Sequence, residues 1–168
     1  RVIPSRAGVD VHVDVGPSEG CDVVLLPTTR LGRFDGLGHD LWMSDEAIAS
    51  MAAEVDMFEM PLEPDRAIET RANGTPYSFA IHVPIFDDVG LTGLSFAALD
   101  HALSLASEAG VMSIEVRPMC VITPTGTLPA SDGYVDAVTA SFGRVWSSGG
   151  LKSCRFVWMV VPESSNPR

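Results

Sequence analysis

The chain has 168 residues, of which 46% are hydrophobic, and its 22 acidic and 11 basic residues give a formal net charge of −11. This length and hydrophobic fraction predict one globular domain over residues 1–168 and exclude a disordered chain. The acidic excess argues against nucleic acid and anionic membrane surfaces as partners, because clustered Lys and Arg neutralise phosphate groups. No apolar run approaches the roughly 20 residues of a membrane span.

The three cysteines, Cys21, Cys120 and Cys154, are scattered and contain no C-x-x-C pair. Such a set is typical of reduced thiols, so we expect a cytoplasmic protein. The absence of C-x-x-C and H-x-x-x-H spacings leads us to expect no metal site, and no sequence motif indicates a cofactor. Because the first residue is Arg1 rather than Met, we expect a domain excised from a longer protein, whose other domains are potential partners.

The first half of the chain predicts two strands and a helix. Residues 9–15 alternate valine with Asp or His, as in a half-buried strand with all four valines on one face. Residues 22–27 form a continuous apolar run, as in a central strand covered on both faces. A glycine-containing loop over residues 28–39 follows, and Ser44 is placed to cap a helix with an acidic first turn.

The second half predicts an antiparallel pair followed by alternating helices and strands. Asn73-Gly74, between two strand-like runs, is a hairpin signal. Residues 95–110 predict an amphipathic helix capped by Ser95, and residues 113–116 predict a strand. A helix from Ser131 or Asp132 and a closing strand at residues 155–161 complete the chain. These elements predict an α/β domain with three layers, α/β/α, and a mixed sheet of about six strands.

Three consecutive segments resemble one family. Tyr77-Ser-Phe-Ala-Ile-His-Val-Pro-Ile-Phe86 is a strand with a central histidine, an alanine-rich helix follows, and Ser113-Ile-Glu-Val116 is the next strand. Their order resembles the second half of a macro domain, the ADP-ribose-binding module. Asp22-Val-Val-Leu-Leu-Pro-Thr-Thr29 is similar to the family's D-A-I-V-N-A-A-N segment. The resemblance implies a macro-like fold, an ADP-ribose-like ligand and a buried structural role for His82.

The chain departs from the family in both binding loops. Leu26 and Thr29 stand where the family has asparagines, the second of which lies near the distal ribose in hydrolases. Residues 28–39 replace the family's G-G-G loop, and residues 118–131 replace a shorter loop of the type S-T-G. Phe34 and Tyr134 are the candidates for the aromatic side chain that usually stacks there.

The resemblance implies a ligand site built from the ends of the first two strands and from these two loops. Asp14 is the candidate for the acidic residue that recognises adenine, and glycines and hydroxyls in the loops suit phosphate oxygens. The ligand-binding candidates are Asp14, Asp22, Thr28, Thr29, Arg30, Gly36, Gly38, Arg117, Thr123, Thr125, Gly126 and Thr127. The catalytic candidates, if the chain is an enzyme, are Asp35, His39 and Asp40.

The sequence supports three hypotheses for function. The first is a binding module for ADP-ribose or a related NAD-derived nucleotide, as in the ligand-sensing domain of a bacterial defence effector. The second is an ADP-ribosyl hydrolase that uses the acidic loop residues. The third is an interaction domain that keeps the fold without a nucleotide pocket. Loss of both asparagines favours binding without efficient hydrolysis.

Overall fold

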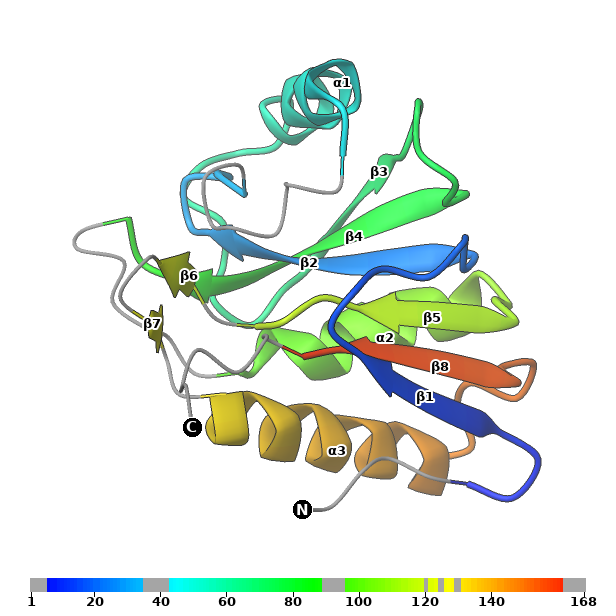
Figure 1. Cartoon of the computed structure of the whole chain (residues 1–168). Helices are drawn as coiled ribbons and strands as arrows, with labels where there is room; N and C mark the ends of the chain where they lie inside the picture. Colours follow the sequence, from blue (N-terminus) through cyan, green and yellow to red (C-terminus); the bar gives the residue numbers. More distant parts are fainter. Residues whose placement is uncertain are drawn as a thin grey trace.

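The computed structural model describes residues 6–34, 43–88, 96–119, 121–123, 126–128 and 131–161. Within these residues the main sheet has six strands in the order β1-β8-β5-β2-β4-β3 (Figure 1). Its strands are β1 (Asp10–Asp14), β2 (Val23–Thr29), β3 (Ile68–Arg71), β4 (Phe79–Phe86), β5 (Ser113–Val116) and β8 (Phe156–Val160). Five of them run parallel, and β3 is antiparallel to its neighbour β4. The predicted mixed sheet is confirmed.

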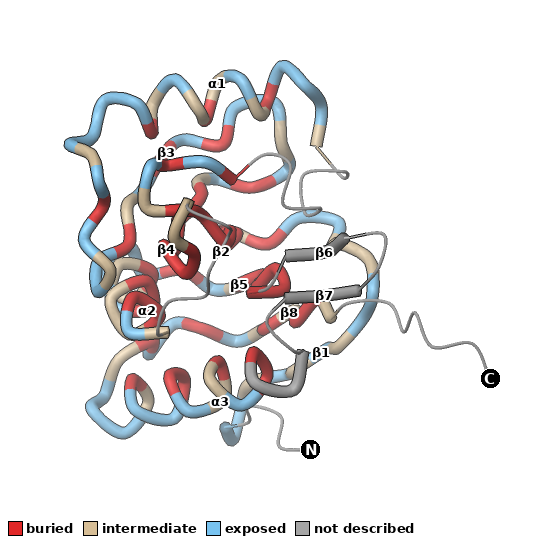
Figure 2. Tube along the Cα trace, turned by 90° about the vertical axis from the view of Figure 1, so that its left-hand side faces the viewer, coloured by how far each residue is buried: buried red, intermediate tan, exposed pale blue. Residues whose placement is uncertain are grey.

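Helices cover both faces of this sheet. Helix α1 (Asp45–Val55) packs on one face, and α2 (Ala98–Glu108) and α3 (Ser131–Ser147) pack on the other (Figure 1). Because side chains alternate along a strand, Val23 and Leu25 of β2 enter the core beneath α2 and α3, whereas Val24 and Leu26 enter the core beneath α1. The central strands are consequently buried on both faces (Figure 2). This arrangement confirms the predicted three-layer fold.

The two kinds of strand pattern have different structural causes. β2 is buried along its whole length, which explains its continuous apolar run. β1 lies at the sheet edge, so Val11 and Val13 pack against the core while Asp10, His12 and Asp14 are exposed. Val15 was expected on the buried face, but the strand ends at Asp14 and 46% of Val15 is exposed.

The helix boundaries differ from the prediction at one end. Ser44 caps α1 as predicted, because its hydroxyl accepts a hydrogen bond from the Ala47 N–H at 3.1 Å. Helix α2 begins at Ala98, and Ala97 before it supplies no side-chain cap. Ser95, the predicted cap, lies outside the described residues. None of the helices in the described part of the chain is long and apolar enough to cross a membrane.

Two connections are more elaborate than predicted. β3 and β4 form the antiparallel pair expected from Asn73-Gly74, but the connection extends over residues 72–78 and includes a turn in which Thr75 N–H donates to Ala72 O. The region of residues 118–131 was predicted as a loop. It contains a small antiparallel hairpin of β6 (Val121–Thr123) and β7 (Gly126–Leu128).

Candidate functional site

The five parallel strands point the same way, so their carboxyl ends lie together along one side of the sheet, called here the carboxyl edge. Their last residues are Asp14 in β1, Val160 in β8, Val116 in β5, Thr29 in β2 and Phe86 in β4. The loops that follow such carboxyl ends form the ligand sites of open α/β sheets. This edge therefore brings together the residues after β2 and β5, which the sequence predicted as the two binding loops.

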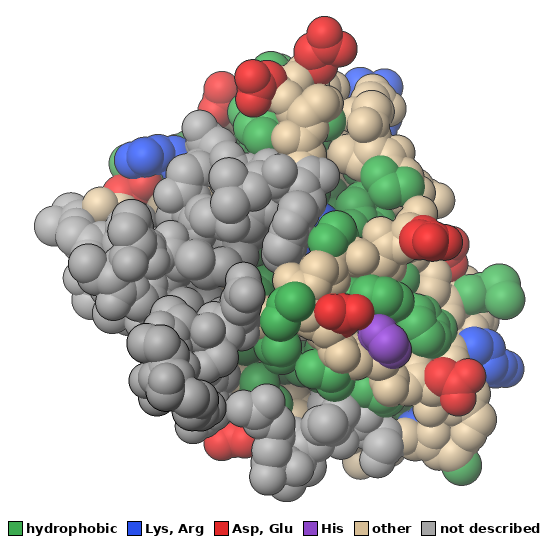
Figure 3. All heavy atoms as spheres, in the orientation of Figure 1, with side chains coloured by type: hydrophobic (Ala, Val, Ile, Leu, Met, Phe, Trp, Pro, Cys, Tyr) green, Lys and Arg blue, Asp and Glu red, His purple; other side chains and the backbone are tan. Residues whose placement is uncertain are grey.

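Asp14 presents an exposed carboxylate at this edge. Its Oδ1 accepts a hydrogen bond from the Val15 N–H at 2.7 Å, and its Oδ2 lies 3.4 Å from His12 Nε2. The Val15 N–H, followed by His12, lowers the pKa of Asp14 below its ordinary value. The face of the molecule seen in Figure 3 carries acidic side chains and a histidine beside hydrophobic side chains. Asp14 is an ionised hydrogen-bond acceptor in solvent.

Thr29 is buried and holds the start of the loop after β2. Its hydroxyl donates to Asp88 Oδ1 at 2.7 Å and accepts from the Arg33 N–H at 3.1 Å. Asp88 Oδ2 in turn accepts from the Leu31 N–H at 2.8 Å. The residue at the family's asparagine position therefore fixes the backbone of residues 29–33.

Thr28 and Arg30 flank Thr29, and their polar atoms make contacts within the protein. Thr28 is buried, and its hydroxyl donates to Leu26 O at 3.2 Å. Arg30 donates from Nε to Leu62 O at 2.9 Å, while Leu62 N–H donates to Arg30 O at 2.7 Å. The Arg30 side chain is thus held against the segment between α1 and β3.

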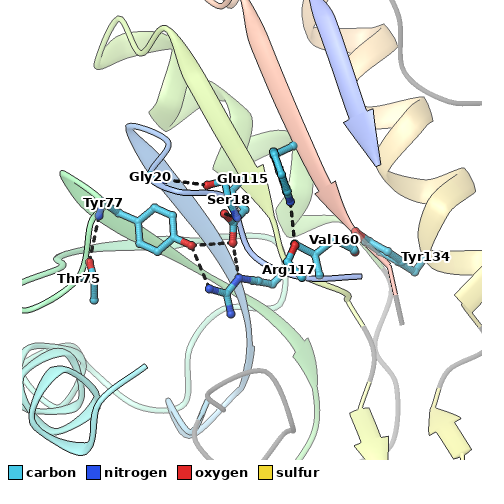
Figure 4. Close-up of polar contacts among 10 residues, drawn as sticks. Ser18, Gly20, Thr75, Tyr77, Glu115, Arg117, Tyr134 and Val160 are labelled. Carbon is cyan, nitrogen blue, oxygen red and sulfur yellow. Dashed lines mark hydrogen bonds and ion pairs between the residues drawn. The ribbon is translucent and has the colours of Figure 1, made fainter. Parts of the chain in front are cut away.

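A buried polar cluster forms where β5 ends (Figure 4). Arg117, a ligand candidate, donates from Nε to Glu115 Oε2 at 2.5 Å and from Nη2 to the Tyr77 hydroxyl at 3.0 Å. Tyr77 donates to the same Glu115 oxygen at 2.7 Å. Ser18 N–H donates to the other oxygen, Oε1, at 2.8 Å. The cluster joins the β1–β2 loop, the β3–β4 connection and β5.

Burial controls the chemistry of this cluster. Arg117 and Glu115 are 1% and 0% exposed, so their charges are stable only because each is paired and hydrogen-bonded. Burial raises the pKa of Tyr77 far above its ordinary value, so its hydroxyl stays protonated and donates to Glu115. In this position Arg117 neutralises an internal carboxylate.

Asp22 lies at the amino end of the central strand β2, opposite the carboxyl edge. It precedes the first residue of β2, and its Oδ2 accepts hydrogen bonds from Met112 N–H at 2.7 Å and Ser113 N–H at 3.3 Å. Seven residues of extended chain separate Asp22 from Thr29, roughly 23 Å at the usual strand rise. The structure does not bring Asp22 together with the ligand candidates at the carboxyl ends of the strands, among the residues it describes.

The remaining candidates lie in the two loops. Thr123, Gly126 and Thr127 are on the β6–β7 hairpin, in which Thr123 pairs with Gly126. Figure 1 shows this hairpin beyond the carboxyl ends of the parallel strands. The candidates outside the described residues are Asp35, Gly36, Gly38, His39, Asp40 and Thr125. The pocket between the loops therefore stays a prediction.

The central histidine and the two aromatic candidates are internal. His82 is 0% exposed, its Nε2 lies 2.9 Å from the Thr70 hydroxyl, and Phe34 packs edge-on against its ring. Burial lowers the pKa of His82 to about 3, so the ring is neutral. Tyr134 is also buried and donates to Val160 O at 3.0 Å. The buried structural role expected for His82 is confirmed.

Sequence reasoning did not identify Glu115 or Tyr77 as polar partners. It noted Asp88 at the end of a strand, as a ligand residue or a turn residue, but did not connect it with Thr29. Glu115 and Arg117 are opposite charges two residues apart in an apolar strand, which places both on one face. That spacing indicates a buried ion pair and was the signal for the cluster.

Solved structures with a similar fold identify this architecture. The macrodomain of Mycobacterium tuberculosis DarG matches with a TM-score of 0.60 at 11% identity, over 93% of this chain and 99% of that one. A Trypanosoma brucei macrodomain in complex with ADP matches with a TM-score of 0.60 at 15% identity, over 92% of this chain and 64% of that one. The same macrodomain in complex with ADP-ribose gives 0.56 at 15% identity, over 89% and 62%.

Sequence comparison adds no relative to these structures. No protein-family model matches the chain, and no curated protein does. The matches in structure nevertheless cover most of the chain. The chain has the fold of the macrodomains.

Proposed function

We propose that this chain binds ADP-ribose or a related NAD-derived nucleotide at the carboxyl edge of its sheet. The observation that carries the proposal is the macrodomain fold, because a T. brucei macrodomain of that fold is described in complexes with ADP and with ADP-ribose. Within a longer protein this chain would be the ligand-sensing domain, as in a bacterial defence effector.

Asp14 supports the proposal through its position and charge. It ends β1 at the carboxyl edge, and its carboxylate is exposed and held ionised by the Val15 N–H. An ionised carboxylate accepts hydrogen bonds from an exocyclic amine such as that of adenine. We assign Asp14 the recognition of the base.

Leu26 and Thr29 support binding without efficient hydrolysis. Leu26 is 2% exposed within the core beneath α1 and offers no polar atom. The Thr29 hydroxyl is already bonded to Asp88 and to the Arg33 N–H. Neither side chain is arranged to position the distal ribose, which is the task of the family's asparagines.

The test is calorimetric titration with ADP-ribose, ADP, NAD⁺ and AMP, comparing Asp14→Asn with Asp10→Asn. Both residues are exposed on the same face of β1, so the two changes alter the charge equally. Asp14→Asn is expected to weaken binding about tenfold, since a hydrogen bond to a charged group contributes roughly 1.5–3 kcal/mol. Asp10→Asn is expected to bind normally.

The alternatives give different results. No heat of binding with any of the four nucleotides would favour an interaction domain without a nucleotide pocket. Rapid release of ADP-ribose from an ADP-ribosylated protein would favour the hydrolase, and the variants Asp35→Asn and Asp40→Asn would then be slower. Equal weakening by Asp10→Asn and Asp14→Asn would remove the assigned role of Asp14.

A further inference from the structure

A groove of about 700 Å³ lies on the β3 side of the sheet. It is formed by the segment between α1 and β3, by the start of β3, by His101 and Leu105 of α2, and by Arg30, which is bonded to Leu62 O. That segment runs along the outside of the molecule from α1 toward α2 (Figure 2). The groove borders β3, the outermost strand on the side of the sheet opposite β1 and Asp14. The groove is therefore a surface separate from the one that carries Asp14.

Two outward-facing backbone N–H groups, one just before β3 and one at its last residue, already have hydrogen-bond partners. Ala67 N–H donates to His101 Nδ1 at 2.9 Å, and Arg71 N–H donates to Glu54 Oε1 at 3.2 Å. Alternate residues of a strand direct their backbone groups to the same side, so Glu69 also directs its N–H and C=O outward. No side chain in the described residues accepts from the Glu69 N–H. One residue of the edge is left to pair with another extended chain.

The groove beside Glu69 has an apolar lining. Phe58, Met60 and Leu62 contribute from the segment before β3, and Ile68 and Leu105 contribute from β3 and α2. Phe58 is 40% exposed, and its neighbour Met57 is 85% exposed. Exposed large hydrophobic side chains beside an open strand edge are typical of surfaces that take an extended peptide.

The charge around the groove selects the kind of peptide. Residues 54–71 contain six acidic and two basic residues, a local net charge of −4. In the lining of the groove itself, three glutamates outnumber two arginines, Arg30 and Arg66, and Arg30 is bonded to Leu62 O. Glu59, Glu63 and Glu69 line the groove, and none of them forms an ion pair within the described residues. Arg71 is already paired with Glu54 at 3.4 Å. Carboxylates of this kind attract Lys and Arg side chains and repel nucleic acid and acidic peptides.

We propose that this groove binds an extended, basic peptide segment of a partner protein. The segment pairs with the backbone of Glu69, its apolar side chains lie against Phe58 and Leu105, and its Lys or Arg side chains face Glu59 and Glu63. The proposal does not rest on nucleotide recognition by Asp14, because the groove is on the β3 side of the sheet; Arg30 is the one ligand candidate that also lines the groove.

The test is an NMR titration of the ¹⁵N-labelled chain with two synthetic peptides of equal length, one alternating Lys with Leu and one alternating Glu with Leu. The Lys peptide is expected to shift the amide signals of residues 58–62 and 68–71, and the Glu peptide is expected to shift neither. Equal shifts with both peptides, or no shift in these residues with the Lys peptide, would overturn the proposal.

Variants separate the charge from the backbone contact. Glu63→Lys with Glu69→Lys is expected to weaken the Lys peptide about tenfold, whereas Glu19→Lys with Asp136→Lys, the same charge change at exposed positions outside the groove, is not. Glu69→Gln keeps the N–H and should bind with an intermediate affinity. Glu69→Pro removes that N–H without touching the β4 ladder and should abolish binding. Unchanged binding by Glu69→Pro, with the fold retained, would refute pairing at this edge.

Discussion

Arg117, directly after β5, forms an ion pair with Glu115 of the same strand, and neither side chain has more than 1% of its surface exposed. Such a pair stabilises a fold only while both members are present, because a single buried charge without its partner is strongly unfavourable. Tyr77 and Ser18 N–H satisfy further polar atoms of the pair. The cluster thereby ties two connections, the β1–β2 loop and the β3–β4 connection, to β5, the strand that precedes the β6–β7 hairpin.

The first prediction concerns removal of one partner. Glu115→Ala is expected to lower the free energy of unfolding by about 3–5 kcal/mol, because Arg117 is then buried without its counter-ion. Glu115→Leu with Arg117→Met should lose less, since no charge is left in the core. Urea unfolding followed by circular dichroism measures both. A double variant less stable than Glu115→Ala would contradict this account.

The pair between Asp100 of α2 and Arg144 of α3 is the control. It is bidentate, with both N···O distances at 2.8 Å, but the two side chains are 45% and 58% exposed. Arg144→Met should therefore cost about 1 kcal/mol or less, and 1 M NaCl should remove most of that difference. A comparable loss for the exposed and the buried pair would show that burial is not the cause.

The second prediction follows from His82. Its pKa is about 3 in the folded protein and about 6.5 in the unfolded chain, so the folded state binds fewer protons between these values. The stability is fully present above pH 6.5 and falls as the pH decreases toward 3, with a slope of up to about 1.4 kcal/mol per pH unit. His101, whose pKa is also lowered by burial, adds to this slope.

Urea unfolding between pH 7.5 and 4.5 measures the slope. His82→Gln should flatten it, because glutamine does not titrate in this range. His12→Gln changes an exposed side chain and serves as the control. A wild-type curve that is flat over this range, or a slope in His82→Gln equal to that of the wild type, would contradict the assignment of the slope to His82.

The third prediction tests the contact between Thr29 and Asp88. Thr29→Val keeps the shape of the side chain but removes its hydrogen bonds, and it should cost about 1.5–3 kcal/mol because the acceptor is charged. A double-mutant cycle with Asp88→Ala should give a coupling energy of about 1–2 kcal/mol. Thr28→Val is the control, since that hydroxyl donates to Leu26 O in the same strand and has no contact with Asp88 among the described residues. Equal coupling of Thr28 and Thr29 to Asp88 would contradict the assignment.

Most of the fold could be predicted from local patterns, and the polar contacts could not. The apolar run of β2 and the alternation of β1 reflect burial on two faces and on one, so periodicity revealed them. Glu115 depends on Tyr77 and Ser18, which lie 38 and 97 positions away, and Thr29 depends on Asp88, 59 positions away. Side-chain pairing over such separations leaves no periodic signal.

The β6–β7 hairpin was missed for another reason. Its strands have three residues each, which is too short for alternation to be recognised. Arg117 was a ligand candidate because an arginine beside the second loop suits a diphosphate, a reason that does not take account of Glu115 on the same face. Resemblance to a family located the edge of the sheet where a site is expected, while the contacts of the individual side chains required the structure.

The fourth prediction concerns the backbone of the loop after β2. Gly32 has a φ of +82°, and a Cβ atom there would lie 2.6 Å from Val55 Cγ1 and 2.7 Å from Met60 Cε. Gly149 has nearly the same φ, +83°, but no atom within 4 Å of such a Cβ. Gly149→Ala should therefore cost about 1–2 kcal/mol for the left-handed backbone alone.

Gly32→Ala should cost a further 1–3 kcal/mol or so, because Val55 is buried and rigid about χ1 and the crowded core must shift. The same shift is expected to displace Met60 and with it the Arg30–Leu62 contact. Urea unfolding gives the two costs, and the amide signals of residues 30–34 and 58–62 report the displacement. Equal destabilisation by the two substitutions would show that the loop yields to the added methyl group, and Gly32 would then be required only for its φ angle.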